Sequence, residues 1–399
     1  MLIKNNYKAT IAAAFLGYIT QAIMLNFPPL LYIFFQDDYG LSLAQVSVLI
    51  SANIVVELVV DIIVSKIAAR VGYRPLILLA TMLATLGLLS MFALPTYMDN
   101  KFLALVLSMM LCGAGGGIME VLISPIVEAC PTKNKSGMMS LLHSFYCWGQ
   151  MGVTLLSTLF FKVVGIEHWK LLACIWAIIP AIGAIAFSIV PIYTLEGDST
   201  KARSGGKKQW GLFAVFFILM TCAGAAEMAM SQWASSFAEA SLGIDKTTGD
   251  LLGPCFFAFL MGSSRIIHAR ISTRIALKPV LIFSAALCAV SYLIAALAPI
   301  PMISLLGCAL CGLSVGVMWP GTYSLAAKNI TNINMSAFAL LAIGGDLGCT
   351  LGPSAVGWIA EQFGGNLKIS FLISAIFPIL ILSILLIYGK KIKNRKKDA

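Results

Sequence analysis

The chain contains the basic stretch Asp61-Ile-Ile-Val-Ser-Lys-Ile-Ala-Ala-Arg-Val-Gly-Tyr-Arg-Pro75, and about 200 residues later it contains Arg265-Ile-Ile-His-Ala-Arg-Ile-Ser-Thr-Arg-Ile-Ala-Leu-Lys-Pro279. Three isoleucines, one arginine and the closing proline are identical in the two stretches. A second pair follows in the same order, Cys112-Gly113-x-x-x-Gly117-x-Met119 and Cys311-Gly312-x-x-x-Gly316-x-Met318. Chance similarity between apolar segments rarely gives two matches at similar offsets, so we predict that the chain consists of two repeats.

The composition places these repeats in a membrane. Of the 399 residues, 59% are hydrophobic and only 11% are charged, and the mean hydropathy is +0.93. Soluble domains carry about 25% charged residues, and a spanning helix needs about 20 apolar residues. The apolar runs predict spans at residues 8–35, 42–65, 75–95, 102–128, 137–161, 169–193, 210–238, 248–270, 278–297, 301–328, 335–360 and 367–389.

The predicted fold is an all-α membrane protein with twelve transmembrane helices in two pseudo-symmetric six-helix bundles. The polar segment 195–209 contains Gly205-Gly206 and several basic residues, which is typical of a flexible connector. It would separate an N-terminal bundle, residues 1–194, from a C-terminal bundle with a basic tail, residues 210–399. Repeats that are six helices apart keep the same orientation in the membrane.

The placement of charge predicts the orientation. A net charge of +10 is compatible with a nucleic-acid partner, but Lys and Arg gather in short connections and in the tail 390–397. With both termini cytoplasmic, the inside connections hold most of these residues, which is the positive-inside pattern. We therefore predict a multi-pass protein of the cell membrane that contacts lipid headgroups and not nucleic acid. A signal peptide at the start is the alternative, and the apolar run that continues to Phe35 favours a helix.

The segment between the second and third predicted spans resembles the loop signature of the major facilitator superfamily, Gly-x-Leu-Ala-Asp-Arg-x-Gly-Arg-Lys. Arg70, Gly72 and Arg74 match this signature, whereas Ser65 and Ala69 stand at its first glycine and at its aspartate. The resemblance covers nearly the whole chain. It implies the twelve-helix fold and secondary transport by alternating access.

Other segments resemble the fucose permease branch of that superfamily, which contains sugar–proton symporters. Glu120-Val-Leu-Ile-Ser124-Pro125 is similar to the branch's Glu-x-x-x-Asn-Pro pattern, and residues 224–233 are similar to its acidic segment in helix 7. Gln21 and Met24 occupy a region where the branch often has an aspartate. The resemblance implies transport of a sugar together with a proton.

Three acids inside predicted spans are candidates for substrate or proton coupling: Glu120, Glu227 and Asp346. An acid at mid-membrane costs several kcal/mol, so it usually faces a cavity or a partner. Gly113 and Gly116 lie on about the same helical face as Glu120, and small residues allow close helix packing or leave room for a ligand. A structural ion pair or a packed polar network is the alternative for each acid.

Charges near the predicted cytoplasmic ends suggest an inside gate. Glu57 and Asp61 are four residues apart on one helical face, and Arg265 takes the position of Asp61 in the second repeat. We predict that Glu57, Asp61, Arg70, Arg265 and Arg274 contribute to this gate. Charged side chains that reach from helix ends to the lipid headgroups are an equally good interpretation.

Polar and aromatic side chains at helical spacing are predicted to line a cavity. His143, Tyr146 and Gln150 form such a stripe within one apolar span. The full predicted set is Gln21, His143, Tyr146, Gln150, Gln232, Trp233, Trp319 and Tyr323. Aromatic faces beside hydrogen-bonding groups suit a sugar or another small polar ligand, and packing is the alternative. Pro28-Pro29 is expected to kink the first span.

The sequence does not indicate an enzyme, a cofactor or a metal site. It lacks a phosphate-binding Gly-Lys-Ser/Thr loop, and its histidines lack metal-ligand spacing. We predict a monomeric secondary transporter of a small polar solute by alternating access, with sugar–proton symport as the favoured form. A proton-driven exporter is one alternative, and a membrane sensor with a transporter-like body is another.

Overall fold

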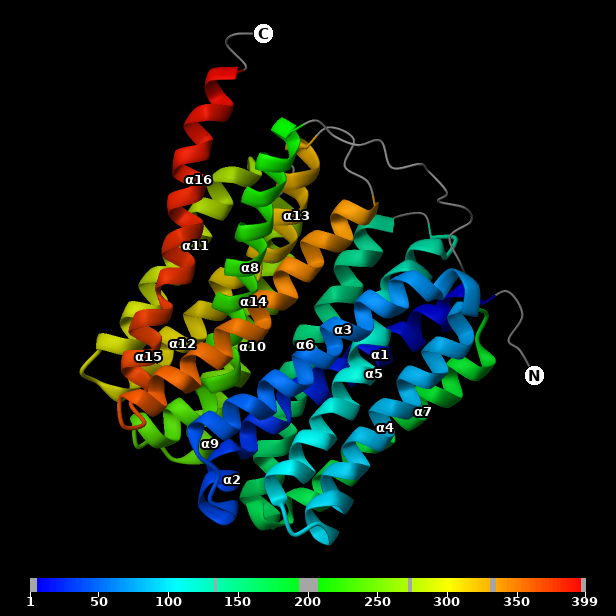
Figure 1. The fold of residues 1–399 in the computed structure, drawn as a ribbon, viewed down its shortest axis with the longest axis vertical. Helices are drawn as coiled ribbons and strands as arrows, with labels where there is room; N and C mark the ends of the chain where they lie inside the picture. Colours follow the sequence, from blue (N-terminus) through cyan, green and yellow to red (C-terminus); the bar gives the residue numbers. More distant parts are fainter. Residues whose placement is uncertain (1–5, 133–134, 194–206, 272–274, 331–334, 396–399) are drawn as a thin grey trace. The chain divides into compact units, whose positions relative to one another are not determined.

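The computed structural model describes residues 6–132, 135–193, 207–271, 275–330 and 335–395. These residues form helices and short connections, without a β-strand among them (Figure 1). Their contacts divide the chain into two compact units, Met1–Ser199 and Thr200–Ala399. The first six predicted spans fall in unit 1 and the other six fall in unit 2.

Unit 1 begins with a broken span. A 3-10 turn, η1 (Pro28–Leu31), separates α1 (Tyr7–Asn26) from α2 (Tyr32–Tyr39), so the predicted kink at the two prolines is confirmed. A proline ring removes a backbone donor and thereby interrupts the α-helical ladder. The remaining elements are α3 (Leu43–Val71), α4 (Tyr73–Tyr97), α5 (Lys101–Ala129), α6 (Lys135–Val164), η2 (Ile166–His168) and α7 (Trp169–Ile189).

Unit 2 contains two π-helical turns near one end of its first two spans. α8 (Lys207–Ser236) continues into η3 (Phe237–Ser241), and α9 (Lys246–Asp250) leads through η4 (Leu251–Cys255) into α10 (Phe256–Ile271). π-turns are rare and often mark functional or constrained positions. The other elements are α11 (Leu277–Leu297), α12 (Pro301–Val315), α13 (Met318–Asn329), α14 (Met335–Gln362), α15 (Leu367–Ser374) and α16 (Ile376–Arg395).

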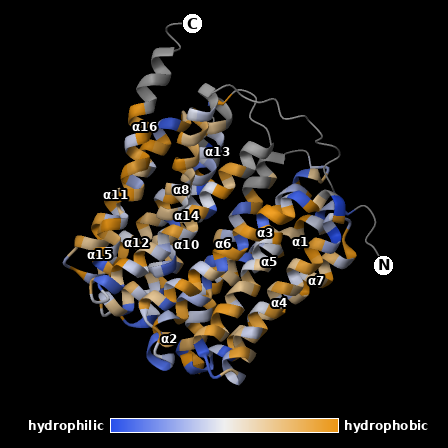
Figure 2. Cartoon of the chain, viewed as in Figure 1, coloured by the Kyte–Doolittle hydropathy of each residue, from blue (hydrophilic) through white to orange (hydrophobic). Residues whose placement is uncertain are grey.

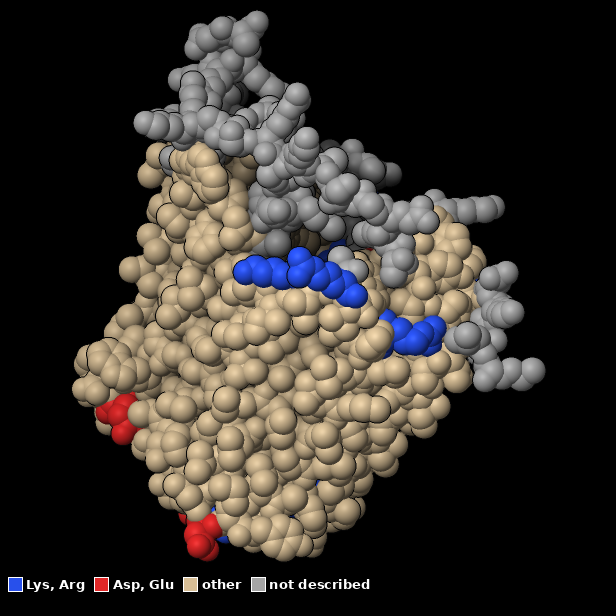
Figure 3. All heavy atoms as spheres, turned by 45° about the vertical axis from the view of Figure 1, so that its right-hand side comes forward, with Lys and Arg blue, Asp and Glu red and all other residues tan. Residues whose placement is uncertain are grey.

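The surfaces of the helices are suited to lipid. Within the described residues, eleven helical segments are long and apolar enough to cross a membrane, and α14, with 28 residues, covers the remaining predicted span, 335–360. Large apolar side chains are exposed in these spans, for example Leu86 (55%) and Ile178 (53%). Apolar residues run along the helices in Figure 2, and the face drawn in Figure 3 has a broad uncharged area. The predicted all-α membrane fold is confirmed.

The two repeats use the same glycines for the same packing. In unit 1, a Cβ at Gly113 of α5 would collide with the carbonyl oxygen of Asn53 in α3. In unit 2, a Cβ at Gly312 of α12 would collide with the carbonyl oxygen of Phe257 in α10. One turn further along each helix, Gly117 and Gly316 lie against the backbones of Glu57 and Met261. The sequence repeat is therefore a repeat of helix packing, because only glycine permits so close an approach of two backbones.

Replacing Gly113 with alanine should destabilise the protein by about 1–3 kcal/mol, the usual range for an overpacked site. The added methyl group would push α3 and α5 apart at the Asn53 carbonyl. Gly152 in α6 is the matched control, since a Cβ there meets no atom within 4 Å. Gly152→Ala should leave stability unchanged or raise it by up to about 1 kcal/mol, because alanine favours helix. Thermal unfolding of the two purified variants would measure both stability changes. Equal unfolding midpoints for the two variants would contradict the close packing of α3 against Gly113.

One end of unit 1 carries its basic connections. Arg74 donates hydrogen bonds from its guanidinium to the carbonyl oxygens of Phe187, Ser188 and Val190, at 2.7–2.8 Å, and so caps the end of α7. The hydroxyl of Thr10, early in α1, donates to the Pro191 carbonyl at 2.6 Å. The start of α1, the α3–α4 connection and the end of α7 thus lie together. We call this the basic end of unit 1.

Candidate transport site

A polar cluster of three side chains joins three helices of unit 1. The Gln21 side-chain amide nitrogen in α1 donates to Glu57 Oε1 in α3 at 3.1 Å and to Glu120 Oε2 in α5 at 2.8 Å. Gln21 and Glu57 are only 4% and 6% exposed, and Glu120 is partly buried. The two carboxyl groups lie close to each other, because they accept from the same nitrogen. We call these residues the acid cluster.

The glycine-rich face of α5 makes room for the acids of α3. A Cβ at Gly116 would lie 2.9 Å from Glu57 Oε1, and a Cβ at Gly117 would lie 2.7 Å from Asp61 Oδ1. Larger residues at these positions would displace the carboxyl groups. The small-residue face that was predicted beside Glu120 therefore packs against α3, and it also shapes the acid cluster.

A second polar cluster lies beside the first and links α1 and α5 to α6. The Tyr18 hydroxyl is 3.0 Å from the Ser124 hydroxyl and 3.3 Å from His143 Nδ1. The Tyr18 and His143 rings meet edge to face with centroids 5.2 Å apart. Tyr18 is 5% exposed, whereas His143 is exposed. Tyr18 was absent from the predicted site, because a lone tyrosine in an apolar run is indistinguishable from a packing residue.

The predicted polar stripe on α6 contacts α1 at a second point. The Asn26 amide donates to the Tyr146 hydroxyl at 3.3 Å, while Gln150 is almost completely buried at 1% exposure. Phe15 and Phe145 also stack, with ring centroids 4.0 Å apart. α1 and α6 therefore share polar and aromatic contacts along their length.

The corresponding region of unit 2 holds a charge of each sign. Glu227 in α8 is partly buried and interacts electrostatically with Arg265 in α10. Arg265 Nε donates to the Gly316 carbonyl at 3.2 Å. Arg265 and Gly316 are the repeat counterparts of Asp61 and Gly117, which also lie against each other in unit 1. The two units thus place charged side chains at equivalent glycine contacts, with different charges.

The remaining candidates of unit 2 surround the contact of α14 with its neighbours. Trp233 is completely buried and its indole nitrogen donates to the Pro353 carbonyl at 3.0 Å. Gln232 is 2% exposed and Asp346 is 8% exposed. The Trp319 ring lies against Gly345, the neighbour of Asp346, and its centroid is 6.4 Å from that of Tyr323.

The predicted gate residues are spread over two units. Glu57 belongs to the acid cluster, Asp61 lies one turn further along α3, and Arg70 is exposed near the end of that helix. Arg274 lies outside the described residues. The inside gate stays a prediction.

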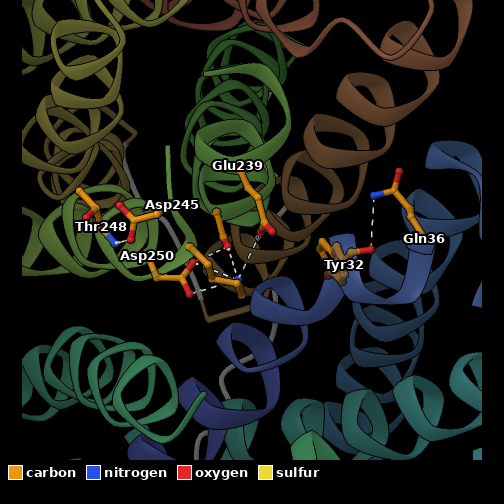
Figure 4. Close-up of polar contacts among 8 residues, drawn as sticks. Tyr32, Gln36, Glu239, Asp245, Thr248 and Asp250 are labelled. Carbon is orange, nitrogen blue, oxygen red and sulfur yellow. Dashed lines mark hydrogen bonds and ion pairs between the residues drawn. The ribbon is translucent and has the colours of Figure 1, made fainter. Parts of the chain in front are cut away.

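A charged network that the sequence analysis missed lies at the end of α8 in unit 2 (Figure 4). The Lys246 ammonium is 3.1 Å from Asp250 Oδ2, 3.8 Å from Glu239 Oε2 and 3.2 Å from the Ser235 hydroxyl. Ser235 also donates to Asp250 at 2.5 Å. Asp250 is only 1% exposed. Its position within a predicted span could have identified it from the sequence as a buried acid. The network connects η3 to α9, which leads into η4.

The sequence model of the Major Facilitator Superfamily matches residues 10–332 and, in a second match, residues 215–399. The chain belongs to the Major Facilitator Superfamily. A curated relative, the membrane protein MosC of Rhizobium meliloti, is 25% identical over 306 residues, which are 76% of this chain and 72% of MosC. The family assignment confirms the resemblance seen in the loop signature.

Solved structures of transporters share the fold of this superfamily member. A single-residue variant of the Escherichia coli fucose:proton symporter FucP gives a TM-score of 0.65 at 15% identity and covers 94% of this chain and 98% of its own. A D-xylose-proton symporter gives 0.74 at 13% identity, covering 93% and 95%. A single-residue variant of the nucleoside transporter NupG gives 0.73 at 13% identity, covering 95% and 99%.

Proposed function

We propose that this chain is a proton-coupled symporter that takes up a small polar solute, with a sugar as the favoured class, by alternating access. The observation that carries the proposal is the acid cluster, in which Gln21 holds Glu57 and Glu120 together inside unit 1. Carboxyl groups inside a membrane protein are costly, and in transporters they commonly mark ion or proton pathways.

The geometry of the acid cluster suits a proton site. The two carboxyl oxygens that share the Gln21 nitrogen lie within about 6 Å of each other, and negative charges at this separation repel strongly in a medium of low dielectric constant. A proton on one carboxyl relieves this repulsion. Glu120 is the less buried of the two and is therefore the better placed to exchange that proton.

The side chains near the acid cluster suit a hydroxylated solute. His143 and Tyr146 on α6 are accompanied by Tyr18 and Asn26 on α1, and together they place hydrogen-bonding groups beside aromatic faces. Such surroundings favour small polar ligands such as sugars. Structurally similar transporters include symporters of fucose and of D-xylose, and a nucleoside transporter.

The remaining proposals follow from the distribution of charge. The protein would reside in the cell membrane as a monomer, with both termini in the cytoplasm and the basic end of unit 1 on that side. Glu227 and Asp346 would contribute to the solute site or to coupling from unit 2.

Uptake by proteoliposomes tests the proposal. Vesicles with an alkaline interior would be offered labelled L-fucose, D-xylose and uridine, and we expect one of them to accumulate only while the pH gradient persists. Counterflow without a gradient would measure exchange alone. Extrusion of the label in exchange for entering protons would identify an exporter instead. Thermal stabilisation by one of these solutes without any flux would identify a sensor, and either result would overturn the symport proposal.

A further inference from the structure

The two polar clusters of unit 1 are stacked on the same pair of helices. Tyr18 precedes Gln21 by three residues on α1, and Ser124 follows Glu120 by four residues on α5. Residues at these spacings are neighbours on one helical face. The Tyr18–Ser124–His143 cluster therefore lies one helical turn away from the acid cluster.

That turn leads toward the basic end of unit 1. Tyr18 is closer than Gln21 to the start of α1, where the Thr10 hydroxyl donates a hydrogen bond to the Pro191 carbonyl. Ser124 is closer than Glu120 to the end of α5, and His143 lies in the early part of α6. The second cluster thus occupies the space between the buried acids and the basic end.

His143 is the exposed end of this path, whereas Glu120 and Ser124 are partly buried. Gln21, Glu57 and Tyr18 are 4%, 6% and 5% exposed, respectively, whereas His143 is exposed. An imidazole exchanges protons readily near neutral pH. A hydroxyl group can accept one proton and donate another, so Tyr18 and Ser124 can both pass a proton on.

We propose that Ser124, Tyr18 and His143 form a proton relay between Glu120 and the basic end of unit 1. The relay rests on the proposed function, in which Glu120 carries the coupling proton. The Glu120 carboxyl gives its proton to the Ser124 hydroxyl, directly or through one water, and Ser124 gives its own to Tyr18. Tyr18 then donates its proton to His143 Nδ1. The carboxylic acid and the neutral imidazole become a carboxylate and an imidazolium, which loses its proton to water.

The arrangement of contacts supports this direction of transfer. When Tyr18 donates to His143 Nδ1 at 3.3 Å, its oxygen can still accept from Ser124 at 3.0 Å. The Phe15–Phe145 stack holds α1 against α6 next to these contacts. Tyr18 and His143 are therefore kept close by packing that does not depend on their own hydrogen bond.

Time-resolved infrared spectroscopy of the full chain in lipid tests the relay without a solute. The carboxylic-acid band that disappears in Glu120→Gln would be followed after rapid mixing with D2O. We expect Tyr18→Phe and His143→Ala to slow deuterium exchange at this band by about 100-fold, the lower end of what a positioned acid or base contributes. Added imidazole should restore the rate in His143→Ala, because that position is exposed, but not in Tyr18→Phe.

Tyr32→Phe is the matched control, since it also removes a buried tyrosine hydroxyl from the first span, beyond η1 on the other side of Gln21. It should exchange at the wild-type rate. Unchanged exchange in Tyr18→Phe and His143→Ala would overturn the relay and leave Glu120 as a proton carrier. Equal slowing in Tyr32→Phe, or no rescue by imidazole, would also overturn it. The lack of any band that Glu120→Gln removes would reject the proton site itself.

Discussion

Replacing Glu120 with glutamine is expected to abolish accumulation of the solute while leaving its exchange intact. Glutamine keeps the shape of glutamate and an oxygen that can still accept from Gln21, so the contact between α1 and α5 persists. It cannot carry a proton. The pH gradient could then no longer drive accumulation of the solute.

The size of the effect follows from the gradient. One pH unit corresponds to about 1.4 kcal/mol, which can drive roughly tenfold accumulation of a solute that moves with one proton. The wild type should approach this ratio in proteoliposomes, and Glu120→Gln should equilibrate at a ratio of about one. Counterflow, which needs no net proton movement, should stay within about twofold of the wild type.

Glu128→Gln is the control for this experiment. Glu128 lies on the same helix, two turns beyond Glu120, and is not part of the acid cluster. Its replacement should leave accumulation unchanged. Full accumulation by Glu120→Gln would remove Glu120 from the coupling mechanism, and the loss of counterflow together with accumulation would assign it to solute binding instead.

The predictable parts of the fold are those that follow from the length and spacing of segments along the chain. A span is an apolar run of about 20 residues, so each predicted span coincides with a helix or with a broken helix in the structure. The glycine contacts were predictable for a similar reason, because Cys112–Met119 and Cys311–Met318 repeat in sequence. Both the apolar runs and the repeated motif can be recognised from the order of residues alone.

The partners of buried polar groups were not predictable in this way. The sequence indicates that Gln21 and Glu120 lie in apolar spans, but only the rotation of α1 against α5 brings them within 2.8 Å. Trp233 was predicted to line a cavity, but its hydrogen-bond partner in the structure, the Pro353 carbonyl, was not predicted. Helical periodicity gives the direction of a side chain relative to its own helix, and the neighbouring helix that it meets depends on tertiary packing.

Lys246→Met is expected to destabilise unit 2 by about 3 kcal/mol, because it removes the positive partner of a buried carboxylate. Asp250 is 1% exposed, and its Oδ2 lies 3.1 Å from the Lys246 ammonium. Breaking a buried ion pair commonly costs about 3–5 kcal/mol, and the lower value applies because the Lys246 side chain is 20% exposed. Unfolding of the purified protein in denaturant would measure the change.

A double-variant cycle separates the ion pair from the packing of the lysine. Asp250→Asn alone should cost less than Lys246→Met, because the lysine can still reach Glu239 and solvent. Lys246→Met combined with Asp250→Asn should recover much of the stability lost by Lys246→Met, since it leaves no buried charge uncompensated. Lys368→Met, on the first turn of α15, is a control that should change stability little. If the costs of the two single replacements simply add, the two charges are not coupled, and the ion pair does not stabilise this end of unit 2.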